Sequence, residues 1–494
     1  MDEEFVPLRN RENCSQEDGF AGDDEDSVEE MEEEDSDLSD EGYKCGSEGE
    51  SGWGSLPDVC LRQVFGFLSD TDRCRADLVC HYWHRVMRSP SLWRSRFFHF
   101  NGRLSKYKQS EYCSALAYAR SLGVYLQRLE VCVCPPRRCL VARRLELAIS
   151  GLLSELTRVN APLQHLSIVR LELDRTSWTL GLRNSLVHCL ILFLRRGSSK
   201  LTSLCLSGMR NCMHHGLDLL SALSYSQRRH YPRCYILSLD IKGFFSASVH
   251  AHRNATLQLT MSRLQGLTNL NLSYACLSDE LLAVLQHRRR EWRSSSRDGN
   301  TLQTFSLYCT LNEPHRQVVS GGSWATLTSS CPDLKVKLTV DQVINTNWLA
   351  RILLPEIPLT EYTMTAFYSP DEVWSGKPLV RYMLPQYRSS LEHLTLDLSN
   401  CNDSLDEDLL ELVKMCERLE QLRIWAFLEI STVEKLLHIR LTQRSLLNKI
   451  RVRIYSVNDD VGEQEDQLEE ILLSHPHLPP ELEFYAIIYP FVDQ

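Results

Sequence analysis

The stretch LEHLTLDLSNCNDSLDEDLLELVKMCERLEQLRI at residues 391–424 decides the fold, because it repeats one short pattern on either side of a helix-like segment. The pattern L-x-x-L-x-L covers 391–396 and returns, with one isoleucine, at 419–424. Apolar residues at every second position indicate a strand with one buried face. Between the two copies, residues 405–416 have the apolar spacing of an amphipathic helix. The stretch therefore predicts a strand, a helix and a second strand.

The same frame recurs over most of the chain. It starts at positions 126, 163, 201, 267, 302, 391, 419 and 447, with degenerate copies near 237, 336, 362 and 485. Several starts lie 28 to 38 residues apart, and a strand followed by a helix in each irregular repeat is typical of a leucine-rich-repeat solenoid. Each unit of such an array buries its leucines only against its neighbours. We therefore expect an α/β fold whose irregular solenoid runs over residues 126–494.

Residues that alternate with the frame leucines should point away from the core, onto a concave surface of parallel strands that suits a protein partner. Trp425 is the most interesting of them, since aromatic anchors often dominate binding energy. Packing of Trp425 against the next repeat is an equally open interpretation. The candidate substrate-binding residues are Asn271, His393, Asp397, Arg423 and Trp425.

Residues 55–93, SLPDVCLRQVFGFLSDTDRCRADLVCHYWHRVMRSPSLW, predict three short amphipathic helices. Pro57 suits the first turn of the first helix, where its missing N–H would be unpaired anyway. Asp70 or Asp72 can cap a second helix that reaches Cys80, and a third short helix follows. Because such a small core is marginal alone, we expect this module to pack against a partner.

These residues closely resemble an F-box, whose pattern has Leu-Pro near its start, then Asp-Arg, Leu-Val-Cys-x-x-Trp and a final Leu-Trp. The resemblance implies that the helices bind a Skp-type adaptor and, through it, cullin and a RING subunit. The alternative is a generic helical bundle whose tryptophans are only core. The residues expected to form or support the adaptor-binding surface are Leu56, Pro57, Leu61, Val64, Phe65, Leu68, Val79, Cys80, Trp83, Leu92 and Trp93.

An F-box followed by degenerate leucine repeats is similar to the F-box substrate receptors. The resemblance implies a substrate-recognition subunit of an SCF (Skp-cullin-F-box) ubiquitin ligase, with an unknown protein substrate. A non-degradative scaffold whose F-box binds the adaptor without cullin is the second hypothesis. An enzyme is the third and weakest, because the chain has no G-x-x-x-x-G-K-[ST] loop, no H-E-x-x-H and no G-x-S-x-G elbow. We expect a non-catalytic protein without a cofactor.

The formal net charge of −11 hides an uneven distribution. Residues 1–50 carry 21 acidic side chains against 3 basic ones, a net of −18, whereas the rest carries 51 basic against 44 acidic, a net of +7. The acidic segment repels itself and lacks apolar periodicity, so we expect residues 1–52 to be a disordered tail. The excess positive charge of so long a body is too small to favour nucleic acid.

The chain has 18 cysteines but starts with acidic residues instead of a secretory signal, and it has no apolar run long enough for a membrane helix. We therefore expect reduced thiols, a cytoplasmic or nuclear location and no membrane partner. Cys132, Cys134 and Cys139 are the best local cluster for zinc, but they lack a second clean pair, so we expect no metal.

The predicted organisation is an acidic tail at 1–52, an F-box at 53–100, a helical linker at 101–125 and the solenoid at 126–494. The basic run HRRREWRSSSR at 287–297 has no apolar period and is predicted to be a loop.

Overall fold

A computed structural model of the chain describes residues 53, 56–102, 111–196, 200–230, 236–264, 266–292, 302–310, 317–343, 345–366, 375–398, 403–456, 461–476 and 478–490. The predicted disordered tail, residues 1–52, lies outside the described residues. Residues from Pro57 onward form one unit. Within the described ranges, no helix has the length and apolar character needed to cross a membrane.

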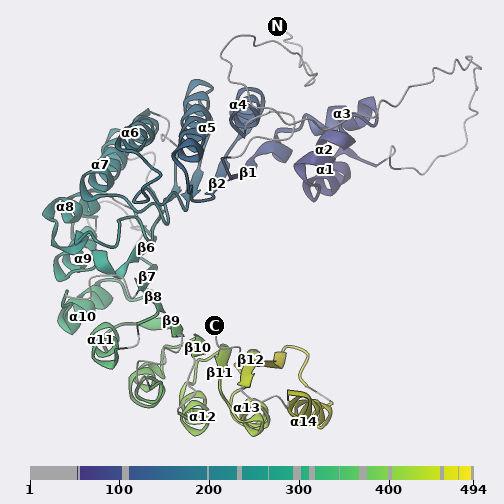
Figure 1. The fold of residues 1–494 in the computed structure, drawn as a ribbon, viewed down its shortest axis with the longest axis vertical. Helices are drawn as coiled ribbons and strands as arrows, with labels where there is room; N and C mark the ends of the chain where they lie inside the picture. Colours follow the sequence, from purple (N-terminus) through teal and green to yellow (C-terminus); the bar gives the residue numbers. More distant parts are fainter. Residues whose placement is uncertain are drawn as a thin grey trace, which may run out of the picture. The chain divides into compact units, whose positions relative to one another are not determined.

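The unit is built on one sheet of parallel strands that pair in sequence order (Figure 1). The sheet curves, and its strands line the inner side. The strands are β1 (Ser95–Phe100), β2 (Arg128–Val133), β3 (His165–Val169), β4 (Ser203–Cys205), β5 (Ser238–Ile241), β6 (Asn269–Ser273), β7 (Thr304–Thr310), β8 (Lys335–Asp341), β9 (Leu359–Ala366), β10 (His393–Leu398), β11 (Gln421–Ala426), β12 (Lys449–Ser456) and β13 (Glu483–Pro490).

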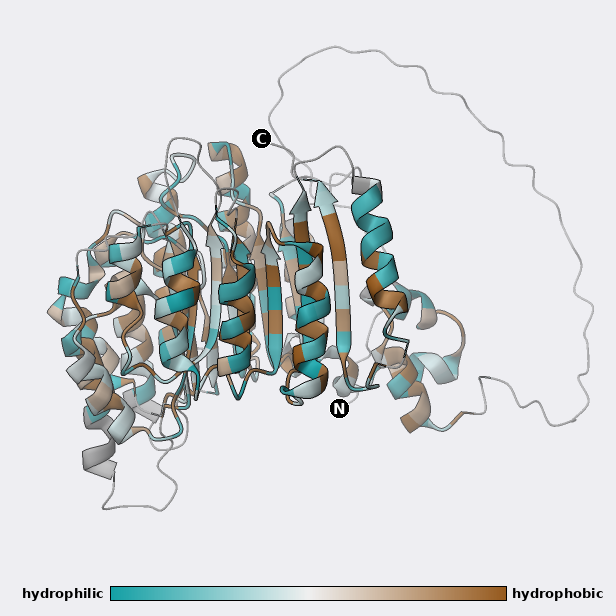
Figure 2. Ribbon diagram, turned by 90° about the horizontal axis from the view of Figure 1, so that it is seen from below, coloured by the Kyte–Doolittle hydropathy of each residue, from teal (hydrophilic) through white to brown (hydrophobic). Residues whose placement is uncertain are grey.

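Helices follow most strands and cover the outer side of the sheet (Figure 1). They are α4 (Glu111–Leu122), α5 (Cys139–Arg158), α6 (Leu180–Arg196), α7 (Met213–His230), α8 (Ala255–Arg263), α9 (Asp279–Trp292), α10 (Gly321–Ser330), α11 (Thr346–Ile352), α12 (Asp406–Met415), α13 (Ile430–Thr442) and α14 (Val461–Leu473). Hydrophobic and hydrophilic residues alternate along strands and helices in Figure 2. The predicted leucine-rich-repeat solenoid is confirmed.

The frame leucines stack from one repeat to the next. Leu394 faces Leu422, which faces Ile450, and all three side chains are fully buried. The alternate residues of the same strands stay partly exposed, so each strand has one face in the core and one on the concave surface. All twelve strands predicted from the frame, including the four degenerate copies, are present.

The solenoid begins earlier than predicted, at Ser95. Strand β1 pairs with β2 and buries Phe98 and Phe100, so phenylalanine fills the place of leucine in the first repeat. The predicted helical linker at 101–125 contains α4, which packs against α5. The last residues of the predicted F-box segment, 53–100, form β1 and thus also belong to the sheet.

The basic run at 287–297 is not a loop in its first part. Helix α9 continues through it to Trp292, because arginine and glutamate are good helix formers even where the apolar period has ended. The remainder, 293–297, lies outside the described residues.

Three short helices precede the sheet, as predicted: α1 (Asp58–Gly66), α2 (Asp70–Ala76) and α3 (His81–Met87). A 3₁₀ turn, η2 (Pro90–Trp93), follows them. The cap of α2 differs from the prediction, because the hydroxyl of Ser69 accepts from the backbone N–H of Asp72. Helix α2 also ends at Ala76 and does not reach Cys80, which instead caps α3.

A buried carboxylate joins two neighbouring repeats at the start of α12. Asp406 accepts from the hydroxyl of Thr432 at 2.6 Å, from the backbone N–H of Glu429 at 2.9 Å and from the hydroxyl of Ser404 at 2.9 Å. Thr432 is fully buried. The pair therefore fixes α13 against α12.

We predict that Asp406→Ala lowers the free energy of unfolding by about 2–4 kcal/mol, because it leaves a buried hydroxyl and a backbone N–H without an acceptor. Denaturant unfolding of the full chain measures this loss. Glu407→Ala is the matched control, since Glu407 is exposed on the same helix turn and its loss should change stability by less than about 0.5 kcal/mol. Equal stability of both variants would contradict the structural role of Asp406.

Candidate functional site

The short helical module is held together by one arginine and an aromatic pair. Arg73 donates hydrogen bonds to the carbonyl oxygens of Phe65 at 3.0 Å, Gly66 at 2.9 Å and Leu92 at 3.0 Å, which ties α2 to α1 and η2. The rings of Phe65 and Trp83 meet edge to face at 5.0 Å between α1 and α3. Arg73, the arginine of the Asp-Arg pair in the motif, therefore stabilises the packing of the short helices.

The predicted adaptor-binding residues fall into three groups by exposure. Leu61, Phe65 and Leu92 are buried and can only support a binding surface. Leu56, Leu68, Trp83 and Trp93 are half-buried. The exposed members are Pro57, Val64, Val79 and Cys80. Their contact with an adaptor stays a prediction.

Several exposed apolar residues of the module were not predicted as adaptor contacts. Phe67 is 86% exposed, Leu78 79% and Val59 67%. We call Val59, Val64, Phe67, Leu78 and Val79 the helical surface. So many large apolar side chains exposed within 21 residues are typical of a protein-binding module. Sequence reasoning treated Leu78 as a helix residue, whereas it follows the end of α2.

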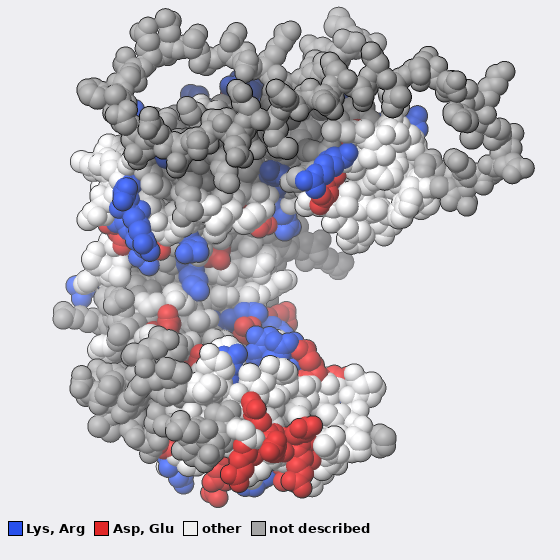
Figure 3. Space-filling view, turned by 45° about the vertical axis from the view of Figure 1, so that its right-hand side comes forward, with Lys and Arg blue, Asp and Glu red and all other residues white. Residues whose placement is uncertain are grey.

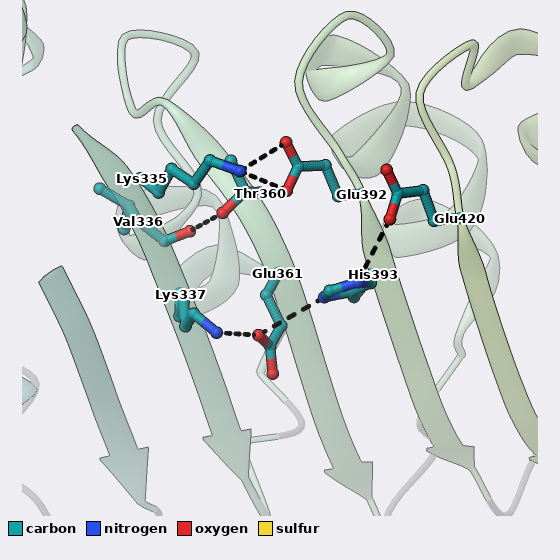
Figure 4. Close-up of polar contacts among 8 residues, drawn as sticks. All are labelled: Lys335, Val336, Lys337, Thr360, Glu361, Glu392, His393 and Glu420. Atoms are coloured by element: carbon teal, nitrogen blue, oxygen red, sulfur yellow. Dashed lines mark hydrogen bonds and ion pairs between the residues drawn. The ribbon is translucent and has the colours of Figure 1, made fainter. Parts of the chain in front are cut away.

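The concave face carries a network of paired charges on β8 to β10 (Figure 4). Lys335 Nζ lies 2.8 Å from Glu392 and Lys337 Nζ lies 2.6 Å from Glu361. His393 lies between two carboxylates, 3.7 Å from Glu361 and 4.0 Å from Glu420. The two lysines therefore have anionic partners within the protein.

A second group of residues, on β10 to β13, combines arginines with aromatic rings. Asp397, Trp425 and Arg453 are in register on three adjacent strands. The guanidinium of Arg453 lies 4.8 Å from the centre of the Trp425 ring and 5.1 Å from that of Tyr489. We call Asp397, Arg423, Trp425, Arg453, Tyr455 and Tyr489 the concave cluster. Trp425 thus packs against the next repeat, through Arg453.

The two arginines of the concave cluster form no ion pair with a described carboxylate. Among the described residues no ion pair reaches Arg423 or Arg453, and Nε of Arg423 is buried without a hydrogen-bond acceptor. The neighbouring Arg451, in contrast, pairs with Glu483. A guanidinium stacked on rings still presents its N–H edge, so this surface suits an acidic group on a protein partner.

Asp397 is the one carboxylate of the concave cluster and is partly shielded. It accepts a hydrogen bond from the hydroxyl of Tyr455 at 2.9 Å. Burial raises the pKa of Asp397, against the lowering effects of that hydrogen bond and of Arg453. Burial and the bond to Asp397 also raise the pKa of Tyr455.

The structure brings together three of the five predicted substrate-binding residues, Asp397, Arg423 and Trp425. His393 lies at the other end of β10. Asn271 lies on β6, four strands away from β10 in the sheet, where it donates to Asp240 at 3.1 Å. Arg453, Tyr455 and Tyr489 were missed. The alternation in KIRVRIYS (449–456) marks Arg453 and Tyr455 as outward residues, by the same rule that marked Trp425.

Comparison with known proteins identifies the helical module. Residues 53–99 match the F-box-like family model. F-box/LRR-repeat protein 21 of Mus musculus is 40% identical over 58 residues, which are 12% of this chain and 13% of that protein. The protein of the same name from Ovis aries is 41% identical over 58 residues, again 12% of this chain and 13% of the relative. The matched part thus spans only 13% of the length of these relatives.

Among solved structures, the leucine-rich repeat-containing protein LegL7 from Legionella pneumophila is similar at 14% identity and a TM-score of 0.35. The similarity covers 78% of this chain and 100% of that one, but at this score it adds nothing to what the sheet itself shows. The chain therefore joins an F-box-like module to a leucine-rich-repeat solenoid.

The raised pKa of Asp397 predicts a sign for its effect on stability. Because its folded pKa lies above the unfolded value of about 3.9, the folded state holds more protons between the two values, and stability falls as pH rises through this range. Asp397→Asn keeps an acceptor for Tyr455 but removes the charge. Relative to this variant, wild type should lose stability as pH rises from about 4 to 7, measured by denaturant unfolding at each pH. A constant difference would show that Asp397 is not penalised by burial.

Proposed function

We propose that this protein is the substrate-recognition subunit of an SCF ubiquitin ligase. The helical surface binds a Skp-type adaptor, and through it cullin and a RING subunit, while the concave cluster binds a protein substrate. The observation that carries the proposal is the coincidence of the F-box-like match at 53–99 with a module that exposes Phe67, Leu78 and Val79. The segments SLPDVCLRQVF, RADLVC and IWAFL also resemble F-box only protein 39.

In this proposal the protein has no catalytic residue of its own. It holds a substrate lysine near a charged conjugating enzyme and so raises the effective concentration of the reacting groups. A rigid array serves this purpose, because each repeat is fixed by its neighbours and the bound substrate keeps one orientation. We place this receptor in the cytoplasm or the nucleus, where its free cysteines would stay reduced.

We predict that Phe67→Asp combined with Leu78→Asp abolishes adaptor binding, because two exposed apolar contacts become charged. The measurement is co-purification of a Skp-type adaptor and cullin with the full chain. Leu180→Asp is the control, since Leu180 is 66% exposed on α6, outside the module, and should leave binding unchanged.

The melting temperature of each variant checks that the array stays folded. Undiminished adaptor binding by the double variant would overturn the F-box assignment. Adaptor recovered with wild type in the absence of cullin would instead support the non-degradative scaffold.

We predict that Arg453→Ala removes a subset of proteins that wild type captures when the proteasome is inhibited, because it deletes the stacked cation of the concave cluster. Arg195→Ala is the matched control. Arg195 also lies over a tyrosine ring, that of Tyr225 at 5.9 Å, but on helix α6 of the outer side. Identical captured sets for wild type and Arg453→Ala, by quantitative mass spectrometry, would exclude the concave cluster as the substrate site.

A further inference from the structure

Three metal-ligating side chains meet where the chain enters helix α7. The ligand atoms of Cys212, His214 and His215 all lie within 4.8 Å of one another. The Sγ atom of Cys212 is 3.4 Å from Nδ1 and 3.7 Å from Nε2 of His214. Among the described residues, no other group of three or more histidine, cysteine or acidic side chains comes together in this way.

The inner histidine is held in place by a residue of the preceding helix. His215 is buried, and its Nε2 lies 2.9 Å from Oδ1 of Asn184 on α6. Because an amide oxygen only accepts, Nε2 carries the proton and Nδ1 keeps its lone pair. A second hydrogen bond that fixes the tautomer of a ligating histidine is a general feature of metal centres. Asn184 therefore orients His215 for coordination.

Coordination of zinc by these three side chains requires the exposed ring of His214 to turn. Zn–S bonds of about 2.3 Å and Zn–N bonds of about 2.0–2.1 Å in a tetrahedron place sulfur and nitrogen about 3.5 Å apart. The Sγ atom of Cys212 is nearly equally far, at 3.4 and 3.7 Å, from the two nitrogens of the His214 ring, whereas a metal bound to one ring nitrogen and to the thiolate leaves the other nitrogen roughly 5 Å from the sulfur. One thiolate with two imidazoles is also a donor set that selects zinc over magnesium or calcium.

We propose that Cys212, His214 and His215 form a zinc-binding site with three protein ligands. His214 is exposed, so the fourth coordination position faces solvent and takes a water molecule. Binding of Zn²⁺ displaces one proton, that of the Cys212 thiol, and changes no oxidation state. The metal joins the end of the loop after β4 to α7 and, through Asn184, to α6.

This site is not the cluster of Cys132, Cys134 and Cys139 that the sequence analysis considered for zinc. Cys132 lies in β2, Cys139 begins α5, and Cys134 lies between them, exposed. Cys134→Ser is therefore a matched control. It removes an accessible thiol from a cysteine-rich segment without touching the proposed ligands.

The test uses the full chain without a histidine tag, stripped of metal and kept reduced. Zn²⁺ is titrated in competition with a chromophoric chelator, and Co²⁺ is added separately to record the thiolate charge-transfer band. We expect wild type to bind one tight equivalent of Zn²⁺ more than Cys212→Ser or His214→Ala, and Cys134→Ser to equal wild type. Asn184→Ala should keep the Co²⁺ band but bind Zn²⁺ about 10–100-fold more weakly.

His214→Ala keeps the test decisive if Cys212→Ser fails to fold, because His214 is exposed. Zinc should raise the melting temperature of wild type and of Cys134→Ser but not that of His214→Ala. Equal zinc stoichiometry and affinity for wild type and His214→Ala, or an equal loss in Cys134→Ser, would overturn the proposal.

Discussion

The stacking of frame leucines between neighbouring strands is the interaction on which the rest of this molecule depends. Leu394, Leu422 and Ile450 show it, since each is fully buried by the repeats on either side. Such contacts are local in sequence, so the array grows one repeat at a time and tolerates repeats of unequal length. Because side chains alternate across a strand, burying every frame leucine also fixes every outward residue on the concave face. The composition of the concave face is thus a consequence of the core.

The charge pattern of the concave face follows from this register and from one irregularity. Thr360 is an extra residue of β9, which brings Glu361 opposite Lys337 and lets the hydroxyl of Thr360 donate to the carbonyl of Val336 at 3.3 Å. Lys337 thereby pairs with Glu361, and Lys335 pairs separately with Glu392 (Figure 4). Arg423 and Arg453, farther along the array, form no ion pair with a described residue. Figure 3 shows basic and acidic side chains gathered near the hollowed side and the C-terminal end. Unpaired arginines beside aromatic rings are where this surface has binding energy to offer.

The helical module and the solenoid are stabilised by different interactions. The solenoid buries apolar side chains against its own repeats, whereas the module relies on Arg73, whose three backbone hydrogen bonds hold short helices around a small core. Phe67 and Leu78 lie outside that core and remain exposed. The exposed apolar side chains of the module and the arginines of the concave cluster are the two surfaces to which the proposed function assigns the adaptor and the substrate.

The sequence by itself determined the repeat strands, the three short helices and the outward position of Asp397, Arg423 and Trp425, because period-two and period-3.6 patterns are local. It missed β1, where Phe98 and Phe100 replace leucine next to the F-box motif, and it ended α9 too early. Only the tertiary structure decided that Arg453 lies between Trp425 and Tyr489 and that Asn184 reaches His215. Trp425 is 28 residues from Arg453 and 64 from Tyr489, and Asn184 is 31 residues from His215. Residues so far apart in sequence meet through strand register and helix packing, which no local pattern of residues encodes.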